Sequence, residues 1–262
     1  MPEDTVRKPH AVLDLPSRQW KARKVERLLG LDARSGPLRL LEVGTGSGGI
    51  SHYFGTHPEG GFEVEAVDVV DSRLVYEGYR FTQVTGTRLP FADDAFDIVL
   101  SNHVIEHVGD DAEQAEHLAE LRRVMRPNGA GYLAVPNRWM LVEPHYRLAF
   151  LSWWPERWRS AWLRLWGRGA LYDCRPLSRR DLERRLSAAG FRFEQVHYEA
   201  LRATFEIERP QALIWRLLLR HVPERMHVLM GGIYPTLIYR LWVLPLAVEA
   251  GDAKLPALWD AR

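Results

Sequence analysis

Short apolar runs alternate with longer amphipathic stretches over most of the chain. Apolar runs of four to eight residues bounded by turn residues are typical of buried strands in a parallel sheet. Stretches whose apolar residues recur every three or four positions are typical of helices that cover such a sheet. The alternation predicts an α/β fold, with a doubly wound, mostly parallel sheet and helices on both faces. The expected strands are 38–43, 62–67, 80–84, 96–100, 131–136 and 191–198, and the expected helices are 18–29, 49–54, 111–125 and 178–189.

The region from Glu143 to Tyr172 departs from this alternation, because its tryptophans recur every four residues. Successive members are offset by only about 40° around a helix, so they share one face, and arginines line one edge of it. Three interpretations are open: packing against the apolar stretches 212–219 and 233–248, a lid over an apolar acceptor, or contact with an anionic membrane surface. Beyond Pro210 the pattern predicts helices. The repeated tryptophans are Trp154, Trp158, Trp162 and Trp166.

Composition narrows the functional classes. At 262 residues and 46% apolar content the chain can bury a large core, and its net charge of +1 gives no reason to expect a nucleic-acid partner. The single cysteine, Cys174, excludes an intramolecular disulfide and a cysteine metal cluster, so we expect no metal. No signal-peptide pattern follows Met1, and no apolar window is long enough to span a membrane. We expect a cytoplasmic protein, with attachment to a membrane surface as an alternative; the oligomeric state stays open.

The apolar run 38–43 leads into a turn with four glycines, Gly44-Thr45-Gly46-Ser47-Gly48-Gly49. Glycine lets backbone N–H groups approach a ligand closely. The spacing fits both the dinucleotide pattern Gly-x-Gly-x-x-Gly and the shorter Gly-x-Gly-x-Gly pattern of S-adenosylmethionine binders. Glu42, two residues before the first glycine, favours the second pattern, because a carboxylate there attracts an ammonium group and repels a pyrophosphate.

Four stretches in order strengthen this interpretation: LLEVGTGSGG, EVEAVDVVD, LPFADDAFDIVLSNHVIEHV and LRRVMRPNGAGYLAVPN. Together they resemble the class I S-adenosylmethionine-dependent methyltransferases, in particular the small-molecule, type 11-like branch. The resemblance runs from residue 38 to 137 and continues weakly to 198. It implies a Rossmann-like sheet of seven strands, S-adenosylmethionine as cofactor, and in-line transfer of its methyl group. The seventh strand is expected near 199–207.

The candidate cofactor-binding residues lie at the ends of the predicted strands. Asp68 follows Gly46 by about twenty residues, a spacing that places a carboxylate against ribose hydroxyls; Asp71 is the weaker alternative. Thr85 stands where members of the similar family commonly carry an aspartate that meets the adenine amino group, so Gly86 is an alternative donor. The full candidate set is Glu42, Gly44, Thr45, Gly46, Gly48, Asp68, Val69, Thr85, Gly86, Thr87, Ser101 and Asn102.

The transferable methyl group is expected beyond the carboxyl end of strand 96–100, because ligands bind there in open α/β sheets. His103 and His107 are the candidate bases for an acceptor hydroxyl, and a structural role for His107 is the alternative. The aromatic region favours a hydrophobic small-molecule or lipid-like acceptor, with O-methylation preferred. The candidate acceptor-binding residues are Asn137, His145, Tyr146, Trp154 and Trp158.

Two other functions fit parts of the sequence. An NAD-dependent oxidoreductase would use the glycines for a pyrophosphate, but Glu42 argues against it. A non-catalytic, methyltransferase-like partner subunit would use the aromatic surface as a protein interface. The expected organisation is an N-terminal arm and cap helix (1–36), a first core part (37–142), an aromatic and arginine-rich insertion (143–176), a second core part (177–208) and a C-terminal helical elaboration (209–262).

Overall fold

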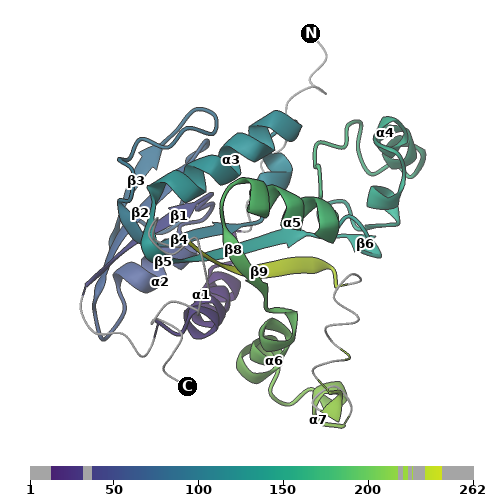
Figure 1. Cartoon of the computed structure of the whole chain (residues 1–262). Coiled ribbons are helices and arrows are strands. Elements are labelled where there is room, and N and C mark those ends of the chain that lie inside the picture. Colours follow the sequence, from purple (N-terminus) through teal and green to yellow (C-terminus); the bar gives the residue numbers. More distant parts are fainter. Residues whose placement is uncertain (1–12, 32–36, 218–220, 224–225, 227–233, 244–262) are drawn as a thin grey trace, which may run out of the picture.

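A seven-stranded sheet forms the centre of the computed structural model, which describes residues 13–31, 37–217, 221–223, 226 and 234–243. The predicted arm before residue 13 and much of the predicted C-terminal elaboration lie outside the described residues. The strand order is β3-β2-β1-β4-β5-β9-β8 (Figure 1). The strands are β1 Leu38–Val43, β2 Phe62–Asp68, β3 Tyr79–Gln83, β4 Phe96–Asn102, β5 Met125–Pro136, β8 Arg192–Gln195 and β9 Thr236–Trp242.

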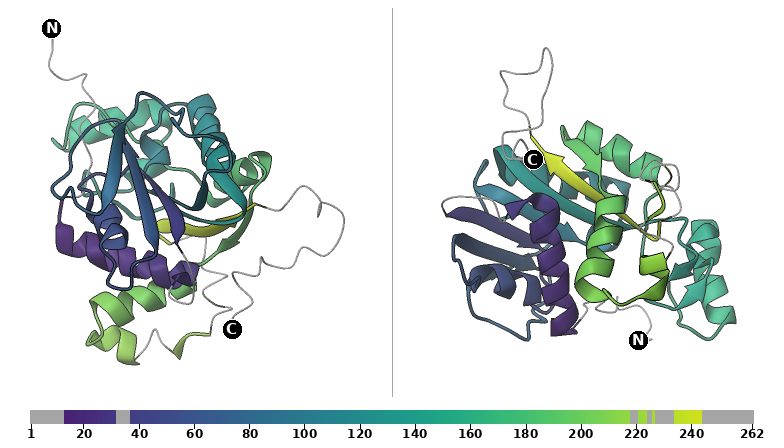
Figure 2. Two further views of the ribbon diagram at one scale, coloured as in Figure 1. Left: turned by 90° about the vertical axis from the view of Figure 1, so that its left-hand side faces the viewer. Right: turned by 90° about the horizontal axis from the view of Figure 1, so that it is seen from below.

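Helices cover both faces of this sheet, as Figure 2 shows from two further directions. Helices α3 and α5 lie on one face, and α1, α2 and α6 lie on the other. The predicted doubly wound architecture is therefore confirmed. The helices are α1 Leu15–Leu29, α2 Gly49–Gly55, α3 Asp111–Val124, α4 Glu156–Leu165, α5 Arg179–Ala188, α6 His197–Glu208 and α7 Leu213–Leu217, with short 3₁₀ turns η3 Ile105–His107 and η4 Leu151–Trp153.

Alternate residues of the central strands enter two separate cores. In β1, Leu40 packs toward α1 and α2, whereas Leu41 packs toward α3 and α5. In β4, Ile98 belongs to the same core as Leu40 and Val99 to the same core as Leu41. All four side chains are almost completely buried. Because parallel strands covered on both faces have no solvent side, they appear in the sequence as continuous apolar runs. This burial explains why β1, β2 and β4 could be located from the sequence.

The C-terminal half of the sheet differs from the prediction. Residues 199–207, expected as the seventh strand, lie inside helix α6, and the missing strand is β9, in a region expected to be helical. β9 runs antiparallel between β5 and β8, so the predicted C-terminal elaboration supplies an interior strand of the core sheet. The predicted strand 191–198 is also shorter, because α6 begins at His197.

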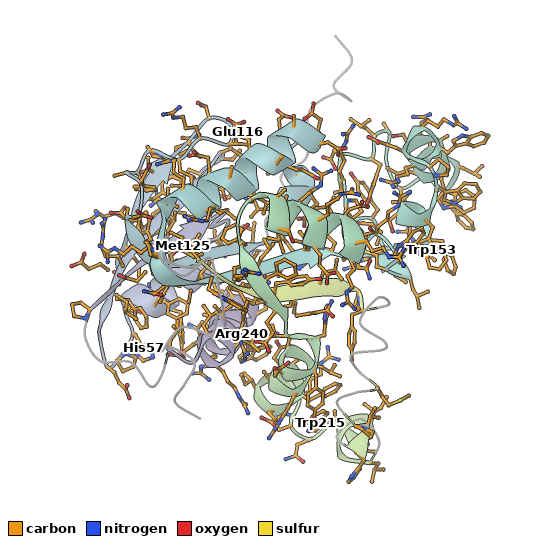
Figure 3. All side chains as sticks on the ribbon, in the orientation of Figure 1. His57, Glu116, Met125, Trp153, Trp215 and Arg240 are labelled. Atoms are coloured by element: carbon orange, nitrogen blue, oxygen red, sulfur yellow. The ribbon has the colours of Figure 1, made fainter. Side chains whose placement is uncertain are left out.

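Arg240 shows why β9 was not recognised. This arginine interrupts the apolar run, yet its side chain is buried in the structure (Figure 3). Its guanidinium donates to the Leu28 carbonyl at the end of α1 and to Glu194 of β8. Buried charge is tolerated where it is paired and hydrogen-bonded, and here both partners come from elements remote in sequence.

The insertion forms its own small core beside the sheet. Helix α4 packs with η4 and with a two-stranded hairpin, β6 Val142–Glu143 and β7 Leu148–Ala149. Among the described residues this cluster draws only on the insertion itself, and it includes the partly buried Trp162. The packing of the tryptophans against 212–219 and 233–248 is therefore not what the described residues show. None of the helices in the described part of the chain combines the length and apolar character needed to cross a bilayer.

The position of β9 in the core can be tested with two leucines from the C-terminal region. Leu237 of β9 is fully buried, whereas Leu217 of α7 is 74% exposed. We expect Leu237→Ala to lower the free energy of unfolding by about 2–5 kcal/mol, because it leaves a cavity. We expect Leu217→Ala to change it by less than about 0.5 kcal/mol. Urea denaturation followed by circular dichroism gives both values, and equal effects would contradict the placement of β9.

Candidate active site

The glycine turn that follows β1 lies at the edge of the sheet where the carboxyl ends of the parallel strands meet. Gly44 has φ of +79°, and a Cβ there would lie 2.3 Å from a side-chain carbon of Val104. Gly48 has φ of +78°, and a Cβ there would lie 2.2 Å from the Tyr79 hydroxyl. Both glycines therefore let neighbouring segments close around the turn.

Glu42 holds this turn from the inside. Its side chain is 2% exposed, and Oε2 accepts hydrogen bonds from the Thr45 hydroxyl (2.9 Å), the Ser51 hydroxyl and the Ser51 amide (3.0 Å). Burial raises the pKa of Glu42 to about 7, although these hydrogen bonds and the nearby Arg18 guanidinium oppose the rise. The contacts in the structure make Glu42 and Thr45 organisers of the turn; their contact with a ligand stays a prediction.

Asp68 holds the same turn from the neighbouring strand. Its Oδ2 accepts a hydrogen bond from the Gly46 amide (2.8 Å), and its Oδ1 accepts one from the Val69 amide (2.8 Å). The turn 85–87 begins beside it, because the Val84 amide donates to the Asp68 carbonyl (3.0 Å). The structure thus brings the predicted Asp68, Val69 and 85–87 together at one edge, with Val69 54% exposed beside them. Asp71, by contrast, pairs with Arg73.

The end of β4 carries the next group of predicted residues. Ser101 is buried, and its hydroxyl lies 3.3 Å from Nε2 of His117, so its side chain supports the core here. The side-chain oxygen of Asn102, Oδ1, is buried with no hydrogen-bond partner in the described part of the chain. His103 adopts φ of +59°, unusual for a residue other than glycine, and its Nδ1 lies 3.3 Å from Oε1 of the buried Glu106.

Asn137, a predicted acceptor-binding residue, has a structural role in the loop after β5. Its side chain is fully buried, its amide donates to the Tyr234 carbonyl (2.8 Å), and its carbonyl oxygen accepts from the Trp139 amide (3.0 Å). A buried amide engaged by two backbone segments fixes the loop after β5. The contact of Asn137 with an acceptor stays a prediction.

His107 and His145, predicted separately, lie next to each other. Their ring centroids are 5.3 Å apart, and Nδ1 of His107 lies 3.7 Å from Sγ of the buried Cys174. Tyr146 follows His145 and donates its hydroxyl proton to Asp173 (2.9 Å). Three residues that the sequence did not predict for this site surround the two histidines, namely Glu106, Glu143 and Cys174.

The carboxyl groups of Glu106 and Glu143 are both deeply buried. Burial raises the pKa of Glu143 to about 7, although the amides of Tyr146 and His145 donate to its carboxyl group. Burial would also raise the pKa of Glu106, but the neighbouring His103 and His107 lower it. The one available sequence signal was the acid between two histidines at positions 103, 106 and 107. The others come from segments too far apart in sequence for any local pattern to connect them.

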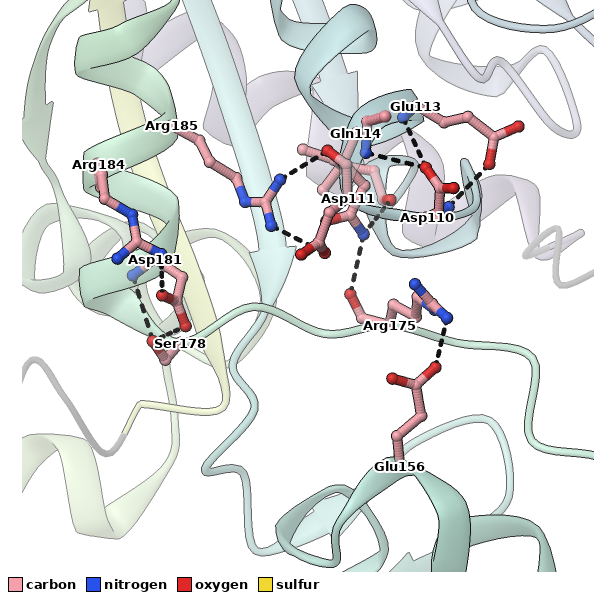
Figure 4. A network of polar contacts seen from close by, with 12 residues as sticks. Asp110, Asp111, Glu113, Gln114, Glu156, Arg175, Ser178, Asp181, Arg184 and Arg185 are labelled. Carbon is pink, nitrogen blue, oxygen red and sulfur yellow. Dashed lines mark hydrogen bonds and ion pairs between the residues drawn. The ribbon is translucent and has the colours of Figure 1, made fainter.

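Polar contacts of Arg175 connect the insertion to the core (Figure 4). The Arg175 amide donates to the Glu106 carbonyl (2.8 Å), and the Arg175 carbonyl accepts from the Gln114 side chain (3.2 Å). The Arg175 guanidinium pairs with Glu156 of α4 (2.6 Å). Asp110 caps the helix that carries Gln114. These contacts fix the backbone next to Cys174 on the side of the sheet where β4 ends.

Exposed aromatic and aliphatic side chains cover the outer side of the insertion, on the side marked by Trp153 in Figure 3. Trp162 lies between Trp154 and Trp166, with ring centroids 5.0 and 5.9 Å apart, while Trp158 points outward. Apolar surface gathered in one place marks sites of interaction. The exposed set is Trp139, Leu141, Val142, Phe150, Trp153, Trp154, Trp158, Leu165 and Trp166.

Comparison with known families agrees with this geometry. A family model described as a methyltransferase domain matches residues 16–196, well over half of the chain. The chain therefore belongs to the methyltransferase-domain family, and the resemblance to class I S-adenosylmethionine-dependent methyltransferases is confirmed. The cofactor of this class is S-adenosylmethionine.

Individual relatives are more distant. An uncharacterized methyltransferase of Mycolicibacterium gilvum is 36% identical over 105 residues, which cover 37% of this chain and 38% of that protein. The chain thus matches well under half the length of this curated relative. A chain from the Haloferax volcanii complex between the Trm112 methyltransferase activator and a methyltransferase superposes with a TM-score of 0.54 at 17% identity, covering 88% of this chain and 92% of that chain. A S-adenosylmethionine-dependent methyltransferase of Methanosarcina mazei gives 0.50 at 15% identity, covering 83% and 98%.

The buried Glu42 predicts a pH effect on stability. Its pKa is raised from 4.5 to about 7 in the folded protein, so the fold binds the proton more tightly than the unfolded chain does. Stability is then lost as the pH rises from about 4.5 through 7, and Glu42→Gln removes this loss because it has no proton to release. Relative to the wild type, we expect the variant to gain up to about 3 kcal/mol between these two pH values. Urea denaturation of the cofactor-free proteins measures the difference; a difference independent of pH would contradict the assignment.

Proposed function

We propose that the protein transfers the methyl group of S-adenosylmethionine to a hydrophobic small-molecule or lipid-like acceptor. The main support for the cofactor site is the hydrogen bond that the Gly46 amide donates to the Asp68 carboxylate. The Asp68 carboxylate lies against the glycine turn, beside the exposed turn 85–87. An ionised carboxylate has about four acceptor sites, so beside the Gly46 and Val69 amides Asp68 can still accept from ribose hydroxyls. The adenine would then lie between Val69 and the 85–87 turn, and the methionine end would lie along residues 44–48.

Methyl transfer requires little of the protein beyond correct positioning of the cofactor and the acceptor. The sulfonium carbon of the cofactor is already electrophilic, so the site mainly has to align the acceptor behind the methyl group and exclude water. For a hydroxyl acceptor, His103 is the better base of the two predicted histidines. Its Nδ1 faces Glu106, and an Nδ1–H held by a carboxylate leaves Nε2 free to take a proton. His107 instead faces Cys174.

The aromatic insertion supports the acceptor class. It stands at the end of β5 and exposes tryptophans beside arginines, a combination suited to an apolar molecule or to a membrane surface that contains one. Trp158 and Trp166 are 53% and 58% exposed, so they are the tryptophans of the insertion most available to such a partner. We propose Trp154, Trp158, His145 and Tyr146 as the acceptor side of the site.

The cofactor site is tested by two neighbouring aspartates. We expect Asp68→Ala to weaken S-adenosylmethionine binding by about tenfold or more, because it removes charge-assisted hydrogen bonds to the ribose. Asp71→Ala is the matched control and should bind like the wild type, since Asp71 pairs with Arg73. Isothermal titration gives the affinities. Binding of NAD⁺ in place of S-adenosylmethionine, or equal losses in the two variants, would contradict the assignment.

The acceptor class is tested with cofactor carrying a radiolabelled methyl group. Incubation with a total extract of the source cells should place the label in the organic phase, and Trp158→Ala combined with Trp166→Ala should reduce it several-fold without changing cofactor affinity. Trp20→Ala, on the 40% exposed Trp20 of α1, is the control. Sedimentation with anionic vesicles, weakened by salt, would assign the tryptophans to a membrane surface. Label in the aqueous phase would contradict the acceptor class, and no transfer at all would favour the non-catalytic subunit.

A further inference from the structure

Three side chains of types that commonly bind metal ions lie together at the junction between the core and the insertion. His107 ends the 3₁₀ turn η3, His145 lies in the β6–β7 hairpin, and Cys174 lies near the end of the insertion. One ligand atom from each lies within 4.8 Å of the other two. Sγ of Cys174 and Nδ1 of His107 are 3.7 Å apart, and the two imidazole rings meet edge to face at 73°.

We propose that His107, His145 and Cys174 bind a divalent transition metal ion with the nitrogen and sulfur preference of zinc. Zinc lies about 2.0–2.1 Å from histidine nitrogen and about 2.3 Å from cysteine sulfur in tetrahedral sites, which places such ligand atoms about 3.6 Å apart. The spacing of Nδ1 and Sγ agrees with this value. Histidine and thiolate ligands select zinc-like ions over magnesium or calcium, which prefer oxygen.

The surrounding carboxylates favour a bound cation. Oε1 of Glu106 lies 3.9 Å from Nε2 of His107, which is too far for a hydrogen bond but places a buried carboxylate beside the imidazole. A metal on Nδ1 would leave Nε2–H on the side of this carboxylate, and carboxylates near a ligating imidazole help to orient it. Oε1 of Glu143 is buried with no hydrogen-bond partner in the described part of the chain.

Binding has a simple proton balance. The Cys174 thiol releases its proton to solvent and coordinates as the thiolate, while both histidines coordinate in their neutral form. Cys174 is 3% exposed, whereas both imidazoles are partly exposed. The backbone beside Cys174 is already fixed by the bonds of Arg175 to Glu106 and Gln114, so little ordering is needed when the ion binds.

Cobalt titration tests the site without reference to methyl transfer. Full-length protein without an affinity tag is stripped with a chelator and titrated with Co²⁺ in the absence of S-adenosylmethionine. We expect one equivalent to give a thiolate-to-cobalt charge-transfer band together with the intense visible bands of tetrahedral cobalt. Because Cys174 is the only cysteine in the sequence, such a band reports this residue alone. Added Zn²⁺ should abolish the bands and raise the melting temperature of the wild type.

Variants then assign the ligands. Cys174→Ser should abolish the charge-transfer band, and His145→Gln or His107→Gln should weaken Zn²⁺ binding more than about 100-fold, since even changes outside the coordinating residues cost 10–100-fold. His52→Gln is the control, because His52 bonds to the Glu77 carbonyl away from the cluster and should leave the titration unchanged.

Two results would overturn the proposal. The wild type would show no charge-transfer band at one equivalent of Co²⁺, or Zn²⁺ would raise the melting temperature of wild type and Cys174→Ser equally. The first result needs no variant, so it stands even if a substitution disturbs folding. S-adenosylmethionine affinity, measured separately, distinguishes loss of the metal from loss of the cofactor site.

Discussion

Two carboxylates, one on each of two neighbouring strands, fix the shape of the glycine turn. Glu42 binds it from beneath through Thr45 and Ser51, and Asp68 binds it from the side through the Gly46 amide. These contacts depend on the register of β1 and β2, in which Val43 stands opposite Val67. The register in turn depends on burial of both faces of the sheet, because a slip by one residue would turn every apolar side chain to the wrong face.

The same dependence explains which features the sequence could predict. Strands β1, β2 and β4 and helices α1 and α3 are defined by local apolar patterns, and the turn and Asp68 follow directly from strand ends. The candidate cofactor residues therefore appear in the sequence as short motifs. Each motif needs only one strand and the loop after it, so neither long-range pairing nor the insertion had to be known.

The remaining features depend on contacts between distant segments. Strand β9 contains an arginine that is compatible with burial only because α1 and β8 supply its partners. Asn137 looks like a ligand-side residue, yet its partner is the backbone of Tyr234, almost a hundred positions later. His107 and Cys174 are separated by an entire insertion. Local patterns carry no information about such pairs, because a side chain's role is set by what tertiary folding brings against it.

The position of β9 also affects how the chain assembles. Its residues are made last among the strands, yet they lie between β5 and β8, which are synthesised earlier. Until β9 leaves the ribosome, β5 is an open edge whose N–H and C=O groups can pair with another chain, and β8 has no place to dock. Completion of the sheet must therefore wait until β9 has been synthesised. During that interval the open edge of β5 is a site at which the nascent chain can aggregate.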